Sequence, residues 1–248
     1  MHLKGQAFLA LWNDFDSARD AEYNCWHTFE HVPERVGIDG VLSSRRYVAL
    51  DRTDRRYFTL YELSNLEALA GASYLNVVEQ PSEWTLTMRP SFRNFCRRPC
   101  ATVWSDGIGH GGSIATLRVR MSSPSIALGE DAWRRALQPL IASAVTVAVH
   151  VGRVDTEAKF PLPNAAGAPE ASEGESCVVL VEGTDRDHVH LAAEATLEAL
   201  HGLGCVCDAT AWEAYDLAFS IDKDELADPS LARQAPRPEL KKRWHPRS

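Results

Sequence analysis

Apolar runs and segments of helical period alternate along the chain in an order that occurs twice. The first half predicts strands over 6–12, 41–50 and 56–63, a fourth strand at 92–96 or 101–104, and helices over 16–31 and 65–72. The stretch 73–90 has a weaker pattern that allows one further helical turn. The Gly-rich segment 105–113 has no periodicity and predicts a linker.

The second half repeats this order. It predicts strands over 114–121, 145–154, 177–182 and 206–219, and helices over 127–144 and 185–203. Strand, helix, strand, strand, helix, strand is the βαββαβ signature. We therefore predict an α+β protein of two ferredoxin-like βαββαβ repeats, over 1–104 and 114–224, with a C-terminal arm over 225–248. The bare faces of the two sheets can pack together in a dimeric-α/β-barrel-type fold.

The first predicted helix carries the sharpest motif of the chain, the run WHTFEH over 26–31. His27 and His31 are four residues apart, so they lie on one side of a helix and can share a divalent metal. The spacing His27-x-x-Glu30-His31 also matches the H-x-x-E-H pattern of inverted zinc peptidases. A pattern with three fixed letters arises by chance, and nothing else in the sequence favours a peptidase.

An α-helical wheel gives this helix an apolar stripe that should face the sheet. Its members are Cys25, Phe29, Val32 and Val36. The wheel places His27 and His31 on the opposite, solvated side unless another segment covers them. Pro33 disfavours helix at the preceding residue, so the helix is expected to end near 31.

The run WHTFEHVPER over 26–35 resembles the WHTxEHxPER element of certain dimeric α/β-barrel proteins. Further segments fit the same family, although Asp39 stands where its pattern usually has Pro. They are 38–41, 45–47, 57–62, 73–75, 84–85 and 92–94. The broader relatives include cofactor-free monooxygenases, lactone isomerases, cyclases and haem enzymes, so the resemblance implies a fold rather than one reaction. Relatives commonly pair, which implies a homodimer.

In the second half the looser resemblance singles out His150, which lies mid-strand in an apolar run. A buried imidazole needs a hydrogen bond or a metal, so a satisfied core histidine is the alternative to a ligand. Glu157 follows at the edge of a loop rich in Pro, Ala and Gly. With His27 and His31, these two residues would supply nitrogen and oxygen ligands for zinc, iron or manganese. Glu30 would then be a base or an additional ligand.

Basic and aromatic residues on the strands are candidates for substrate binding. Arg45, Arg46 and Tyr47 could hold an anionic group, since guanidinium binds carboxylate through two hydrogen bonds. Tyr61 and Trp84 could line an aromatic pocket. The alternatives are a solvated strand face for the former and core packing for the latter. We assign His27, Glu30 and Arg46 as catalytic candidates.

Composition narrows the function classes. The chain has 248 residues, 45% of them hydrophobic, and a net charge of -8. That charge argues against a general nucleic-acid binder, which needs a basic surface. No apolar stretch approaches the roughly 20 residues that span a bilayer. The N-terminus lacks the pattern of a signal peptide, and we expect a cytoplasmic protein with reduced cysteines.

The sequence leads to three hypotheses. The first is a small-molecule enzyme, a metal-assisted or acid–base lyase, isomerase or hydrolase acting on a small carboxylated or aromatic compound. The second is a haem-binding protein or haem enzyme, with His150 as axial ligand. The third is a non-catalytic binding or assembly module in which the His-Glu segment is solvated. Any active site is expected to draw residues from both halves.

Overall fold

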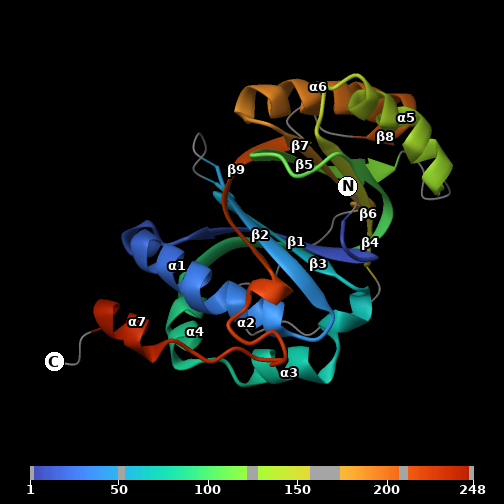
Figure 1. Cartoon of the computed structure of the whole chain (residues 1–248). Helices are drawn as coiled ribbons and strands as arrows, with labels where there is room; N and C mark the ends of the chain where they lie inside the picture. The colour runs from blue at the N-terminus through green and yellow to red at the C-terminus, as the bar shows by residue number, and fades with distance from the viewer. Residues whose placement is uncertain (1–2, 50–53, 122–127, 157–173, 207–211, 246–248) are drawn as a thin grey trace.

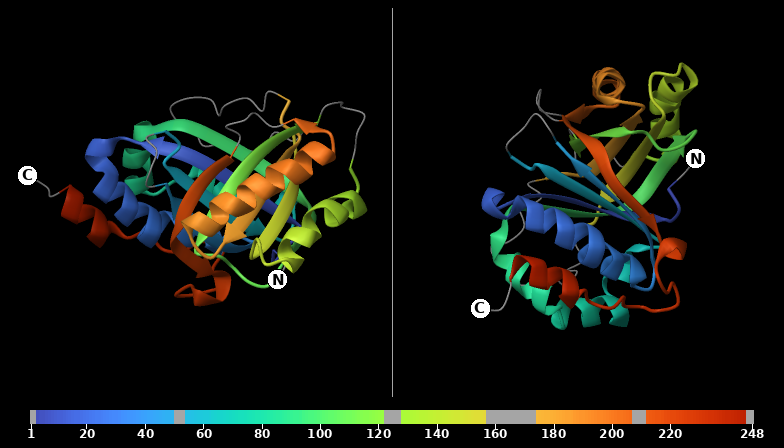
Figure 2. Two further views of the ribbon diagram at one scale, coloured as in Figure 1. Left: turned by 90° about the horizontal axis from the view of Figure 1, so that it is seen from above. Right: turned by 60° about the vertical axis from the view of Figure 1, so that its left-hand side comes forward.

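The computed structural model describes residues 3–49, 54–121, 128–156, 174–206 and 212–245. Its strands form one antiparallel sheet that closes on itself (Figures 1 and 2). Around the ring the order is β4-β1-β3-β2-β9-β5-β7-β6, and β6 pairs with β4 to close it. The strands are β1 (Ala7–Phe15), β2 (Val41–Val48), β3 (Tyr57–Leu63), β4 (Phe92–Gly107), β5 (Ser113–Met121), β6 (Ala148–Val154), β7 (Cys177–Gly183), β9 (Trp212–Asp222) and the short β8 (Cys205–Val206), which pairs with β5 outside the ring.

Helices cover the outside of the barrel in two groups (Figure 1). Over the first half lie η1 (Ser17–Arg19), α1 (Asp20–Trp26), η2 (His27–His31), α2 (Val32–Gly37), η3 (Leu66–Leu69), α3 (Ala72–Glu79), α4 (Glu83–Met88) and η4 (Arg89–Ser91). Over the second half lie α5 (Glu130–Ala142) and α6 (Arg186–Gly202). No helix in the described ranges is both long and apolar enough to cross a bilayer.

The barrel interior is an aromatic and aliphatic core to which both halves contribute. Successive side chains of a strand point to opposite faces, so every second residue enters this core. Trp12 and Phe58 pack there with ring centroids 5.1 Å apart, and Tyr215 of β9 packs on Phe58. The Trp12 indole also donates to Thr116 Oγ1 of the other half, at 3.1 Å. The predicted α+β class and the barrel-like packing of two sheet faces are confirmed.

Three predicted boundaries in this half are wrong, and strand pairing explains those that concern β4. The two alternatives for the fourth strand are parts of β4, which pairs with β1 at its start and with β6 at its end. Residues 105–107 are therefore the end of β4 and Ser113 begins β5, so only 108–112 connects these two strands, which pair with other strands of the barrel. The stretch 73–90 holds α3 and α4, whereas 65–72 forms only the 3₁₀ turn η3.

The arm that follows β9 lies across the helices of the first half. It contains η5 (Lys223–Glu225) and α7 (Pro238–Trp244), and Figure 1 shows it in red beside α2 and α4. Lys223 Nζ donates to the carbonyls of Gly37 and Ile38. We call residues 223–245 the C-terminal strap.

Candidate functional site

The helix that carries the His-Glu-His segment contains a π-turn. The Val32 amide donates to the carbonyl of His27, five residues earlier. Pro33 follows in the first turn of α2, and it has no N–H with which to continue the normal α-helical ladder. The wider turn accommodates the proline, so the helix runs on to Gly37 instead of ending near 31 as predicted. Turns of this kind are frequent at functional sites.

The α-helical wheel is right for Val32 and Val36, which are buried against the sheet, but wrong for residues within the π-turn. Phe29, expected to face the sheet, is 55% exposed, whereas His27, expected in solvent, is only 4% exposed. The rings of His27 and His31 lie side by side with centroids 5.2 Å apart. Both line a cavity between the helix and the sheet. The two histidines are thus brought together, on the buried side.

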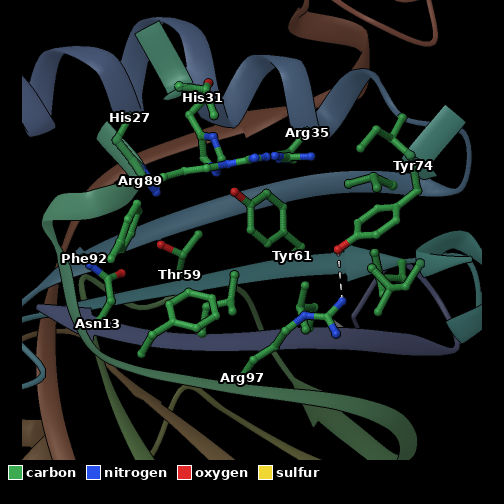
Figure 3. A pocket seen from close by; sticks show the side chains of 18 of the residues that line it. Asn13, His27, His31, Arg35, Thr59, Tyr61, Tyr74, Arg89, Phe92 and Arg97 are labelled. Atoms are coloured by element: carbon green, nitrogen blue, oxygen red, sulfur yellow. Dashed lines mark hydrogen bonds between the residues drawn. The ribbon is translucent and has the colours of Figure 1, made fainter. Parts of the chain in front are cut away.

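This cavity has a volume of about 100 Å³ and lies between the outer face of the first-half sheet and its helices (Figure 3). Its apolar walls come from residues of the strands and helices, among them Leu9, Trp26, Phe92 and Phe95. Tyr61 and Thr59 enter it from β3, and Figure 3 shows the Tyr61 hydroxyl on the side of the histidines. The predicted role of Tyr61 in a pocket wall therefore agrees with its position.

Burial determines the protonation of the two histidines. Desolvation lowers the pKa of His27 well below 6.5, and the charges of Arg46 and Arg35 lower it further. Desolvation likewise lowers the pKa of His31, with added repulsion from Arg35 and Arg89. The Nδ1 atom of each ring is buried and finds no partner among the described protein groups. Both rings are therefore neutral near pH 7, and a neutral imidazole has one nitrogen that accepts a proton.

Three arginines that were not singled out from the sequence also line the cavity: Arg35, Arg89 and Arg97. Arg35 is 9% exposed, and its Nη1 has no hydrogen-bond partner in the described protein. Arg89 donates to the Val78 carbonyl at 3.1 Å. The sequence could have indicated Arg35, because it follows His31 by four residues just as His31 follows His27, which places all three on one side of a helix. Arg89 lies just beyond the end of α4 and has no such signal.

Glu30 does not reach the cavity. Its Oε1 accepts from Ser82 Oγ and its Oε2 accepts from the Arg237 amide of the strap, both at 2.6 Å. Both oxygens are thus engaged on the side of the helix that faces α4 and the strap. The structure places Glu30 where it can anchor the helix, away from the histidine nitrogens.

The predicted substrate residues Arg45 and Tyr47 lie inside the barrel, on the opposite face of the sheet from the cavity. Arg45 Nη1 donates to Glu182 Oε1 at 2.6 Å, and its Nη2 lies 3.5 Å from Glu62 Oε1. Tyr47 packs on Phe58 in the barrel core. Arg45 is therefore already neutralised by carboxylates of the protein.

Arg46 points the other way because adjacent strand residues face opposite sides. Its guanidinium lies over the rings of Tyr23 and Tyr57, 5.2 and 5.1 Å from their centroids, and it donates to Asn24 and Thr28 of the first helix. It is not a cavity-wall residue, although its charge acts on His27. Trp84 is also outside the wall: it is buried in the packing of α1 and α4, and its indole donates to Glu22.

His150 lies in the barrel interior with both ring nitrogens engaged. Nδ1 lies 2.8 Å from Ser105 Oγ, and Nε2 lies 3.0 Å from Glu182 Oε1. It is a satisfied core histidine, and the sheet separates it from His27 and His31. Glu157 lies outside the described residues. Nowhere in the described part of the chain do three or more His, Cys, Asp or Glu side chains form a group able to hold a metal. The described cavity therefore draws on the first half alone.

Comparisons with known proteins establish the fold. No protein-family model matches the chain, and no curated protein matches it by sequence. An anthrone oxidase-like protein superposes over 95% of this chain and 99% of its own, with a TM-score of 0.55 and 11% identity. A candidate monooxygenase from Lactobacillus acidophilus NCFM covers 87% of this chain and 95% of its own, with a TM-score of 0.50 and 9% identity.

A chlorite dismutase variant from Candidatus Nitrospira defluvii is a third neighbour. It superposes over 87% of this chain and 92% of its own, with a TM-score of 0.53 and 8% identity. At such identities the likeness extends to the architecture only. The chain shares its α+β antiparallel barrel with these three kinds of protein.

Proposed function

We propose that this chain is a small-molecule enzyme of acid–base type, whose active site is the first-half cavity. Its substrate would be a small carboxylated or aromatic compound, and its central step the removal of a proton from carbon. That step is common to many lyases and isomerases, and it also precedes oxygen addition in cofactor-free monooxygenases. The metal-assisted version of the hypothesis has no support in the described residues.

One observation carries the proposal: His27 is buried and His31 half-buried in the wall of a cavity, both rings are neutral near pH 7, and each has a buried Nδ1 atom without a partner in the described protein. An unpaired buried nitrogen costs free energy, so folding gains nothing from this arrangement. A ligand that supplies an acidic hydrogen would pair with such a nitrogen. A solvated, non-catalytic His-Glu segment would instead leave both rings exposed.

Tyr61 completes the acid–base set. Desolvation raises the pKa of its hydroxyl above the ordinary value of 10, so the group keeps its proton and can donate a hydrogen bond. A donor beside the base stabilises negative charge that develops on a substrate oxygen as the proton leaves carbon. His27 or His31 would accept that proton, and Tyr61 would stabilise the resulting enolate or phenolate.

Exchange of carbon-bound hydrogen tests the proposal. The protein is incubated in D₂O with aryl ketones, arylacetic acids and hydroxyaryl ketones, and loss of the acidic C–H signal is followed by proton NMR. We expect catalysed exchange with at least one class. His27→Asn or His31→Asn should slow it by about 10²- to 10⁴-fold. His201→Asn, on the exposed end of α6, is the matched control.

The outcomes are distinct. No exchange with any class, or exchange that both cavity variants leave unchanged, would contradict the acid–base role. An oxygen electrode run with the exchanging compound then separates two reactions. Oxygen consumption indicates monooxygenation, and its absence indicates isomerisation or elimination.

A haem-based function is the second candidate, because chlorite dismutase is among the proteins of the same fold. His150 does not fit an axial ligand, since both its ring nitrogens are engaged. The Nδ1 atoms of His27 and His31 fit chemically. However, the cavity of about 100 Å³ is small beside the roughly 300–1,000 Å³ of ordinary ligand pockets. We expect no Soret shift on adding haemin, and a stoichiometric shift would favour this candidate.

We further infer that the two halves are ferredoxin-like repeats of a duplicated unit. In chain order, the strands of each half lie side by side as fourth, first, third and second: β4-β1-β3-β2 and β9-β5-β7-β6. The family resemblance also leads us to propose a homodimer. Light scattering would report twice the 27.5 kDa of one chain if the proposal is correct, and a single-chain mass if it is wrong.

A further inference from the structure

We propose that Arg35, Arg89 and Arg97 form an anion-binding subsite in the first-half cavity, which selects compact carboxylates over neutral compounds of the same shape. This inference rests on the proposed function only in assigning the cavity to a small-molecule ligand. It names the chemical class of that ligand. It also moves the anion-binding role from Arg45 and Arg46 to residues of the cavity wall.

Arg35 is the centre of the subsite. It lies on α2, about one helical turn beyond His31. Its positive charge lowers the pKa of both histidines, of Arg89 and of Arg97. Its Nη1 is buried and makes no hydrogen bond with the described protein. A guanidinium carries its hydrogen-bond donors in a fixed fork that matches the two oxygens of a carboxylate. Arg35 lines the cavity, and one arm of its fork is unpaired within the described protein.

Arg97 adds a second, buried cation from the floor of the cavity. It is a β4 residue with a side chain 9% exposed, and its Nη2 donates to Tyr74 Oη at 3.1 Å (Figure 3). Arg89 adds a third from the end of α4. The helix α2, the strand β4 and the turn η4 thus each contribute one arginine to the wall of the same cavity.

The cavity wall does not balance this charge. None of the described residues that line it is Asp or Glu. Glu34 lies near enough to attract both Arg35 and Arg89, but it is not a wall residue. Its Oε1 accepts a hydrogen bond from Arg233 of the strap. Guanidinium cannot lose its proton in proteins, and an unsatisfied buried donor such as Arg35 Nη1 is costly. An anion between the three arginines would relieve both the burial cost and their mutual repulsion.

The dimensions of the cavity limit the ligand. A cavity of 150 Å³ accepts benzene, and this one has about 100 Å³. The remaining wall is apolar and aromatic, with Trp26, Phe92 and Phe95. A carboxylate on a short chain matches this volume and this combination of cationic and apolar surfaces, and benzoate marks the upper limit of size. Larger polyanions, such as nucleotides, exceed this limit.

Calorimetric titration with matched probes tests the subsite. Acetate, propionate and benzoate are compared with acetamide, propionamide and benzamide, which have nearly the same shapes without the charge. We expect at least one carboxylate to bind about 10- to 100-fold more tightly than its amide. Arg35→Gln should remove that preference. Arg89→Gln, at a half-buried position that tolerates substitution better, should reduce it. Arg134→Gln, on an exposed face of α5, is the control that should leave it unchanged.

Each result decides the proposal. Equal affinities for every carboxylate and its amide, no binding of any probe, or a preference that survives both cavity variants would overturn the subsite. The first of these results would leave the acid–base proposal intact, because deuterium exchange reads His27 and His31 independently of charge selection. If the wild-type protein prefers carboxylates but catalyses no deuterium exchange, the acid–base proposal is overturned and the subsite is supported.

Discussion

At the scale of single residues, His27 and His31 differ from surface histidines because burial and nearby arginines act in the same direction. Desolvation is the largest cause of their lowered pKa, and repulsion by Arg46, Arg35 and Arg89 adds to it. An anion bound at the arginines would remove part of the repulsion and raise the pKa of both rings. Anion binding and the proton affinity of the two histidine rings are therefore coupled. By thermodynamic linkage, protonation of the rings also strengthens anion binding.

The same shift predicts how stability depends on pH. The folded-state pKa of each histidine lies below its unfolded value of 6.5, so the unfolded chain binds more protons and stability falls as the pH falls. Each histidine should lower the free energy of unfolding by about 1 kcal/mol between pH 6.5 and 5.5. Urea denaturation of His31→Asn should show that loss reduced by one such contribution. An unchanged loss relative to wild type would contradict the shift at His31.

A second prediction at this scale concerns the buried carboxylate of Glu182. It accepts from Arg45, lies 3.0 Å from His150, and is fully buried inside the barrel. Removing one partner of a buried ion pair leaves an uncompensated charge. Glu182→Ala should therefore lower the free energy of unfolding by about 3–5 kcal/mol, measured by urea denaturation. Glu194→Ala, on the exposed side of α6, should change it by less than about 0.5 kcal/mol. Similar effects of the two substitutions would contradict the network.

At the scale of elements, the π-turn and the strap together set the position of the histidines. The strap engages the outer side of the helix at two carboxylates: the Arg237 amide donates to Glu30, and Arg233 donates to Glu34 at 3.0 Å. His27 and His31 are on the inner side, so the helix is held between the strap and the cavity. We infer that Glu30 is a positioning residue.

The strap can be tested at Arg233, which donates to Glu34, Asn76 and Gln80. Arg233→Ala should cost about 1–3 kcal/mol, because it leaves the buried Glu34 carboxylate without this donor. Hydrogen exchange of the amides over 27–37 should speed up while that of β5–β7 stays unchanged. Arg243→Ala, exposed on α7, is the control. Equal protection in both variants would show that the strap does not hold the helix.

The sequence predicted most strands, because each combines a short apolar run with turn residues at its ends. It could not predict the π-turn, since the helical wheel assumes regular α geometry and Pro33 was treated as a stop. Alternation along β2 could have shown that Arg45 and Arg46 face opposite sides of the sheet. The length of β4 depends on its partner β6 in the other half, and no local pattern encodes that pairing.

At the scale of the whole molecule, one barrel interior serves both halves. Trp12, Tyr47 and Phe58 of the first half are buried against Ile114, Leu180 and Tyr215 of the second. The arrangement also puts the Arg45 charge of one half beside the Glu182 carboxylate of the other. Neither half has a complete core without its partner.

Separating the halves tests this dependence. A fragment of residues 1–107 should expose the barrel face of its sheet, bind a dye for apolar surfaces and lack a cooperative melting transition. Co-expression with 108–248 should restore cooperative melting, because the two inner faces then cover each other. A fragment 1–107 that melts cooperatively as a monomer would show that the halves are independent domains.

NMR titration of the ring nitrogens is the most direct measurement of whether His27 and His31 are neutral bases at the cavity. Both rings are expected to stay neutral at pH 7 and to protonate only well below pH 6.5. If His27 and His31 instead titrate near 6.5, the value for a solvated histidine, the rings are solvated and the cavity is not an acid–base site.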